Sequence, residues 1–163
     1  MIGEKMLAAL NKQVNAELYA SYLYLAMALD FEDKNFPGFA SWMFKQSKEE
    51  TAHAERIMKH IIERGGKVFL DVIEKPQDTW VDHLASFQAA YDHEIKVTGM
   101  IHNLVKIARE ENDYAAEVML HWFVDEQVEE EEQTSAIVEQ LKLIHNSNNG
   151  LFMLDRALAK RQD

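Results

Sequence analysis

The chain has 163 residues, of which 47% are hydrophobic, with only 6 glycines, 2 prolines and no cysteine. The length fits one domain, residues 1–163, with a core of its own, and the composition favours helices. The lack of cysteine excludes disulfides, thiolate metal sites and thiol catalysis. The formal net charge of −11 favours cations as partners and argues against nucleic acid, because phosphate backbones are bound by clustered lysine and arginine.

The start of the chain and its apolar runs bear on location. Residues 1–5 contain no basic segment followed by an apolar run, and no stretch approaches the roughly 20 apolar residues that span a bilayer. We therefore expect a cytoplasmic protein that has no membrane partner.

Breaks at residues 34–38, 65–80, around 112 and at 146–150 divide the chain into four long blocks and a short tail. The predicted helices are residues 4–33, 38–65, 82–111, 114–145 and 150–160. In chain order, the apolar stripes of the four long helices run from Leu7 to Phe31, Phe39 to Ile61, Leu84 to Ala108 and Ala116 to Ile144. Four long helices with one inward face each predict an all-α four-helix bundle.

The segment 67–80, between the second and third helices, is longer than the turns that join antiparallel neighbours. Extended at about 3.3 Å per residue it covers roughly 45 Å, close to the length of a long helix at about 1.5 Å per residue. It can therefore cross the whole bundle, which makes the second and third helices parallel.

Polar, ligand-type side chains interrupt every stripe near its middle. They follow an internal repeat, because adding 77 to a residue number in the first helix pair gives a matching residue in the second. The offset pairs Glu17 with Glu94, Glu50 with Gln127, His53 with Glu130, Glu49 with Glu126, and the turn residues Asn35 and Asn112. Within each pair of helices the polar residues lie about 27 Å from the turn, so all four helices direct them to the middle of the bundle.

Carboxylates gathered in this way must hold protons or surround cations, because burying them unpaired would cost several kcal/mol each. A pair of divalent metal ions resolves the repulsion. Oxygen-rich ligation with one imidazole suits iron or manganese.

Bundles that hold two irons use one Glu from each of two helices and Glu-x-x-His from each of the other two. Glu50-x-x-His53 supplies that motif here, whereas the second half has Gln127-x-x-Glu130. We expect a firmer site at Glu17, Glu50 and His53 and a looser one at Glu94 and Glu130, with Gln127 in or just outside its shell. Irons that can leave behave as substrates, which favours turnover followed by storage.

The whole pattern resembles the bacterial non-haem ferritins over essentially the entire chain. The resemblance rests on the segment 122–132 (WFVDEQVEEEE), on Tyr24 and on nine ligand-type positions: Glu17, Glu49, Glu50, His53, Glu94, Glu126, Gln127, Glu129 and Glu130. It implies a ferritin-like bundle with the long crossover and the short fifth helix. It further implies a homo-oligomeric hollow shell of 24 subunits, oxidation of Fe(II) by O₂ or H₂O₂, and storage of a ferric mineral.

The resemblance also implies roles for individual residues. Glu17, Glu50 and His53 would bind the first iron, with Glu50 as the bridge, and Glu94 and Glu130 the second. Gln127 would lie next to the incoming oxidant. A third iron would be bound by Glu49, Glu126 and Glu129, with Glu130 shared.

Tyr24 lies two turns after Glu17 on the same stripe, with its side chain tilted back toward the metals. We expect it to donate a hydrogen bond to a ligand carboxylate. The alternative for Tyr24 is a packing role at the margin of the core, and that for Glu49, Glu126 and Glu129 is a solvated acidic face.

Two other functions remain open at this point. The chain could be a redox enzyme that uses two irons on an organic substrate or peroxide. It could also be a bundle without chemistry, whose acidic residues specify helix register.

Overall fold

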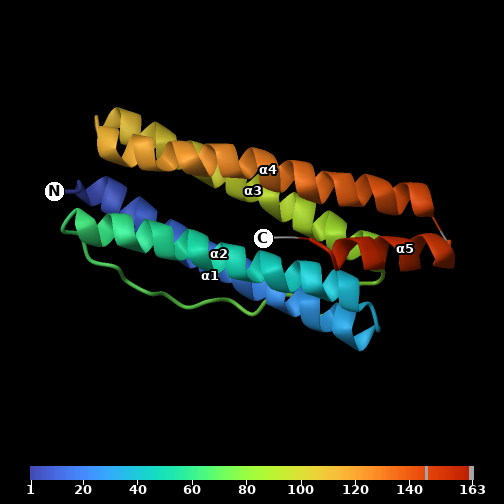
Figure 1. Cartoon of the computed structure of the whole chain (residues 1–163). Coiled ribbons are helices and arrows are strands. Elements are labelled where there is room, and N and C mark those ends of the chain that lie inside the picture. Colours follow the sequence, from blue (N-terminus) through green and yellow to red (C-terminus); the bar gives the residue numbers. More distant parts are fainter. Residues whose placement is uncertain (146, 162–163) are drawn as a thin grey trace.

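The computed structural model describes residues 1–145 and 147–161 and contains five helices. They are α1 (Glu4–Asp33), α2 (Pro37–Glu63), α3 (His83–Glu110), α4 (Tyr114–Ile144) and α5 (Asn148–Leu158). Figure 1 shows two long helical hairpins, α1–α2 and α3–α4, lying side by side, with α5 packed near one end. The described residues form no strand, so the predicted four-helix bundle with a short fifth helix is confirmed. None of the described helices is both long and apolar enough to cross a membrane.

Several helix boundaries differ from the predicted ones by one or two residues. α2 ends at Glu63 rather than 65, because the chain reverses at Gly65 with a φ of 74°. α5 covers Asn148–Leu158 rather than 150–160, because the Ser147 hydroxyl accepts a hydrogen bond from the Gly150 amide and starts the helix earlier. Asn146, the first residue of the predicted fourth break, lies outside the described residues.

The first three helices end in the same way, with one residue in the left-handed region. These residues are Asn35 (φ 61°), Gly65 (74°) and Asn112 (53°). After α1, the Phe36 amide donates to the Phe31 carbonyl over 2.9 Å, and the corresponding bond recurs after α2 and α3. Asparagine and glycine tolerate this conformation, so the two turns related by the 77-residue repeat have the same backbone geometry.

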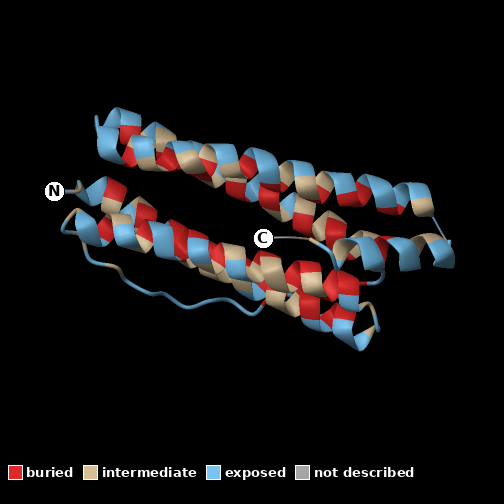
Figure 2. Ribbon diagram, in the orientation of Figure 1, coloured by how far each residue is buried: buried red, intermediate tan, exposed pale blue. Residues whose placement is uncertain are grey.

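The crossover, residues 64–82, runs along α1 and returns the chain to the opposite end of the bundle, so that α2 and α3 are parallel as predicted (Figure 1). Near its start, the Phe69 amide donates to the Asn11 side chain over 2.7 Å. Near its end, Trp80 is buried and its carbonyl accepts a hydrogen bond from Lys34 Nζ at 2.6 Å. Anchors at both ends therefore hold an otherwise exposed segment, as Figure 2 shows.

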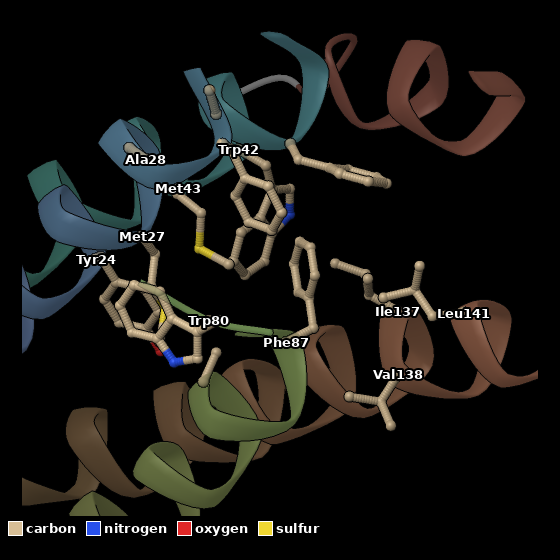
Figure 3. Packing of buried hydrophobic residues seen from close by; sticks show 14 of the residues in the cluster. Tyr24, Met27, Ala28, Trp42, Met43, Trp80, Phe87, Ile137, Val138 and Leu141 are labelled. Atoms are coloured by element: carbon tan, nitrogen blue, oxygen red, sulfur yellow. The ribbon is translucent and has the colours of Figure 1, made fainter. Parts of the chain in front are cut away.

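The apolar core consists of two clusters separated by the polar middle of the bundle. One cluster, partly drawn in Figure 3, includes Tyr24, Met27, Trp42, Met43, Trp80, Phe87, Ile137, Val138 and Leu141. The other includes Met6, Leu10, Val14, Ile57, Ile61, Ile101, Leu120 and Phe123. Large apolar side chains on both sides of the middle exclude water from it, and they make any charge placed there costly.

α5 docks on the first turn of α2. The Phe39 amide donates to Asp155 Oδ1 over 2.9 Å, which satisfies one of the free amides at the start of α2. The backbones approach so closely that a Cβ atom added to Gly38 would lie 1.8 Å from the Asp155 carbonyl oxygen. Glycine at this position therefore allows the fifth helix to pack.

We expect Gly38→Ala to lower the free energy of unfolding by about 2–3 kcal/mol, because α5 must move to admit the methyl group. Chemical denaturation measures the change, and hydrogen exchange of residues 148–158 reports whether α5 has left α2. Gly99→Ala is the matched control, since a Cβ there would meet no described atom within 4 Å beyond its own stretch of α3. It should be neutral or stabilise by about 0.5–1 kcal/mol, and an equal loss in both variants would contradict the docking role.

Candidate metal centre

The middle of the bundle gathers six of the predicted side chains from all four long helices. None of them exposes more than 4% of its surface, and they are Glu17, Glu50, His53, Glu94, Gln127 and Glu130. The sequence repeat places them at one height, and the two apolar clusters close the space above and below. Among the described residues, no lysine or arginine forms an ion pair with the four carboxyls of this group, Glu17, Glu50, Glu94 and Glu130.

Glu17, Glu50 and His53 form one candidate ligand group. One potential ligand atom from each residue lies within 4.8 Å of the other two. His53 Nδ1 is 3.3 Å from Glu50 Oε2, and Glu17 Oε1 accepts a hydrogen bond from Gln13 Nε2 at 2.8 Å. No described residue donates to the buried Glu17 Oε2, so this oxygen is available to a cation.

His53 also belongs to a second candidate group, with Glu126 and Glu130. Its Nε2 atom lies 3.8 Å from Glu126 Oε1, on the side of the ring away from Glu50. The imidazole therefore lies between two acidic groups, one entirely buried and one that includes the half-buried Glu126. Glu94, which we expected to bind the second iron with Glu130, belongs to neither group, so a firmer and a looser iron position remain a prediction.

Glu94 is held by hydrogen bonds from two neighbours. The Tyr24 hydroxyl donates to Glu94 Oε1, which is the kind of contact predicted for Tyr24, and Gln127 Nε2 donates to Glu94 Oε2 over 3.1 Å. Gln127 Nε2 also lies 3.3 Å from Thr98 Oγ1. Gln127 thus orients Glu94 with its amide hydrogens, which an ionised glutamate, the residue that the two-iron motif has at this position, could not do.

Gln46 is the main contributor to the centre that the sequence reasoning left without a role. It was expected on the inward stripe of its helix, one turn before Glu50, and it is fully buried. Its Nε2 atom is 2.5 Å from Glu130 Oε2 and 3.5 Å from Glu50 Oε1, so it links α2 to α4. Its spacing of four residues from Glu50 was the signal that could have revealed Gln46. The 77-residue offset did not reveal it, because the matching residue, Phe123, is apolar.

The three residues expected to bind a third iron lie at the edge of the centre in different environments. Glu126 points toward His53, Glu129 is exposed, and Glu49 is paired with Arg161 over 2.5 Å. Burial raises the pKa of Glu126, and the charges of Glu129 and Glu49 raise it further, so the three are electrostatic neighbours. Of the three, only Glu126 belongs to a candidate ligand group among the described residues.

Burial and mutual repulsion raise the pKa of every carboxyl in the centre. Desolvation is the largest cause for Glu17, Glu50, Glu94 and Glu130, and for three of them the charge of a neighbouring glutamate comes next. For Glu94, the hydrogen bonds from Tyr24 and Gln127 partly oppose the effect. The pKa of Glu130 rises to about 8. Without cations, the centre therefore takes up protons that the unfolded chain would release at neutral pH.

Stability of the metal-stripped protein should fall as the pH rises from about 5 to 8. The folded state keeps Glu130 protonated up to a pKa of about 8, whereas an unfolded glutamate loses its proton near 4.5, so the stabilisation disappears across this window. We expect a loss of about 4 kcal/mol from Glu130 alone. Urea unfolding at several pH values in the presence of a chelator measures it. Glu130→Gln, a permanently neutral isostere, should flatten the dependence, and parallel curves for the two proteins would contradict the interpretation.

Known proteins resemble the chain throughout its length. Residues 7–144 match the ferritin-like domain family. A bacterial non-haem ferritin of Bacteroides fragilis is 41% identical over 99% of this chain and 100% of its own, and one of Staphylococcus epidermidis is 37% identical over 99% and 97%. A crystal structure described as an open pore ferritin from the archaeon Archaeoglobus fulgidus superposes with a TM-score of 0.98 at 46% identity, covering 99% of this chain and 100% of the other. With this family match and this identity along nearly all of its residues, the chain belongs to the ferritin family.

Proposed function

We propose that this protein stores iron by oxidising Fe(II) with O₂ or H₂O₂ at the centre inside each subunit and retaining the Fe(III) within a shell of 24 subunits. The observation that carries the proposal is the group of four buried carboxyls around one imidazole, with no lysine or arginine of the described chain to neutralise them. Membership of the ferritin family supports the same conclusion.

Charge balance favours two divalent ions over one. Four ionised carboxylates carry four negative charges, which two Fe(II) ions neutralise while His53 stays uncharged as a ligand. The two candidate ligand groups, one containing Glu17 and Glu50 and the other Glu126 and Glu130, meet at the imidazole. We assign the first ion to Glu17, Glu50 and His53 of the first hairpin, and the second to Glu94 and Glu130 of the second hairpin.

Oxidation changes the charge balance of the centre in a direction that favours release of the Fe(III) product. Two Fe(II) ions give two electrons to O₂, which takes two protons to become H₂O₂. The resulting Fe(III) ions carry a surplus of positive charge over the four carboxylates, and hydroxide from water must offset it. The second position has Gln127 and Glu130 where the two-iron motif has a glutamate and a histidine, and a neutral amide is a poor metal ligand, so this position holds its ion less tightly and the product can move on.

Tyr24 and Gln127 act on Glu94 rather than on the ion itself in this proposal. Burial and the Glu94 charge hold the pKa of Tyr24 well above its usual value, so the hydroxyl keeps its proton and continues to donate to Glu94. Gln127 donates to the other oxygen of the same carboxylate. Together they restrict the orientation of the Glu94 carboxylate. This keeps Glu94 on α3 directed at the same centre as the ligands on α2.

Aerobic addition of Fe(II) tests the storage function. We expect the wild-type protein to retain many ferric ions per subunit, whereas a redox enzyme would retain about two and a bundle without chemistry none. Glu17→Ala and His53→Ala should each slow the first oxidation by about tenfold or more, because each removes a buried ligand from inside the subunit. Stopped-flow absorbance measures the rate, iron analysis after gel filtration counts the ions, and the elution volume reports the shell.

Glu55→Ala is the matched control for these variants, since Glu55 is an exposed carboxylate on the same helix as His53. It should oxidise and retain iron as the wild type does. Wild-type rates in Glu17→Ala and His53→Ala would contradict the assignment of the centre.

The third iron position is tested by Glu126→Ala and Glu129→Ala. We expect anaerobic Fe(II) binding to fall from about three ions per subunit toward about two, while the first oxidation stays fast and the ratio of Fe(II) oxidised to O₂ consumed changes. Titration under nitrogen and an oxygen electrode provide the two measurements. Glu132→Ala, which removes an exposed carboxylate of α4 farther along, should change neither. Three ions bound by both variants would identify these glutamates as a solvated acidic face.

A further inference from the structure

The residues that follow α5 extend along α2 to the edge of the metal centre. Arg161 Nη2 lies 2.5 Å from Glu49 Oε2, and Nη1 donates to Gln46 Oε1 over 2.8 Å. The guanidinium lies 4.8 Å from the centroid of the Trp42 ring, and Lys45 Nζ donates to the Arg161 carbonyl. Four residues on one face of α2 thus hold a single arginine.

The pair between Arg161 and Glu49 places a permanent positive charge where a third metal ion is expected. The Arg161 side chain exposes only 14% of its surface, and that of Glu49 exposes 35%. Arginine keeps its charge throughout the physiological pH range, and its planar fork binds the carboxylate and the amide at once. A cation that uses Glu49 as a ligand must therefore displace it.

Arg161 also determines what Gln46 presents to the centre. Because Gln46 Oε1 accepts from the guanidinium, the amide nitrogen must face inward, where it donates to Glu130 Oε2. This orientation suits carboxyls that lack a cation, since a hydrogen-bond donor stabilises their negative charge. It does not suit a filled centre, where the amide oxygen would be the better neighbour of a metal ion.

We propose that Arg161 is an internal competitor for metal at the edge of the centre, a positioning residue that holds Glu49 and Gln46 until a third ion displaces it. The proposal rests on the third iron position described above. It makes the C-terminal segment responsive to metal: when the ion binds Glu49, the guanidinium leaves, Gln46 is free to turn, and residues 159–161 lose their hold on α2. A purely structural clamp for α5 would not respond in this way.

Isothermal titration with Zn(II), which is not oxidised, tests the competition on the assembled protein. We expect Arg161→Gln to bind the third ion roughly threefold to tenfold more tightly than the wild type, with the first two ions unchanged. Lys160→Gln is the matched control, because it removes the same charge from the neighbouring exposed residue, and it should behave as the wild type. Arg161→Lys keeps the charge and should stay closer to the wild type than Arg161→Gln does.

Hydrogen exchange provides a second measurement that does not depend on affinity. The amide of Arg161 donates to the Leu158 carbonyl over 3.2 Å, and this local bond should open more often once the Arg161 side chain no longer holds the segment against α2. We expect Zn(II) beyond two ions per subunit to accelerate exchange at residues 159–161 in the wild type. In Glu49→Gln the tail should exchange fast at all Zn(II) concentrations.

Three results would overturn the inference. Equal affinity for the third ion in the wild type and Arg161→Gln would show that the arginine does not compete, while leaving the third position itself intact. If Zn(II) does not change hydrogen exchange at residues 159–161 of the wild type, this segment is not displaced. If the wild type and Arg161→Gln both bind only two ions, there is no third ion position and no competition for it.

Discussion

Four carboxyl groups buried in the middle of a helical bundle must be neutralised, and much of the molecule is arranged around that requirement. Two apolar clusters enclose the carboxyls, which raises their pKa and makes bare charge costly. Amide and hydroxyl donors from Gln13, Gln46, Tyr24 and Gln127 surround them, and these groups stabilise negative charge without cancelling it. The remaining negative charge is neutralised by protons or by divalent ions. Metal binding releases the protons, which connects the protonated and the metal-bound state.

The fold was predictable because its determinants are local or periodic. The 77-residue offset relates two helical hairpins, and it places Asn35 and Asn112 at turns that share one backbone conformation. The length of the crossover required α2 and α3 to be parallel. The clustering of Glu17, Glu50, His53 and the matching residues followed from counting along the helices from each turn, since helix geometry converts sequence distance into height.

What could not be predicted depends on contacts between elements distant in sequence. The buried face of α3 is wider than one stripe, because Val97 and Leu104 are buried beside Glu94, Ile101 and Ala108 where α3 packs against α1 and α4. The pairing of Glu49 on α2 with Arg161, which follows α5, joins residues far apart in the sequence, and nothing in the local pattern of the tail indicates it. Adjacent acidic residues therefore look alike in the sequence although one faces an imidazole and another faces a guanidinium.

The two candidate ligand groups differ in the parts of the chain that they connect. Glu17, Glu50 and His53 all come from the first hairpin, which the ribosome completes before the second has been made. The other group joins His53 of the first hairpin to Glu126 and Glu130 of the second, so it exists only once the hairpins have docked. An ion bound by the first group would stabilise a half-folded chain, whereas an ion bound by the second group would fasten the two halves together. Iron bound by the second group would thereby couple the iron supply to the last step of tertiary assembly, as well as to the turnover of the finished protein.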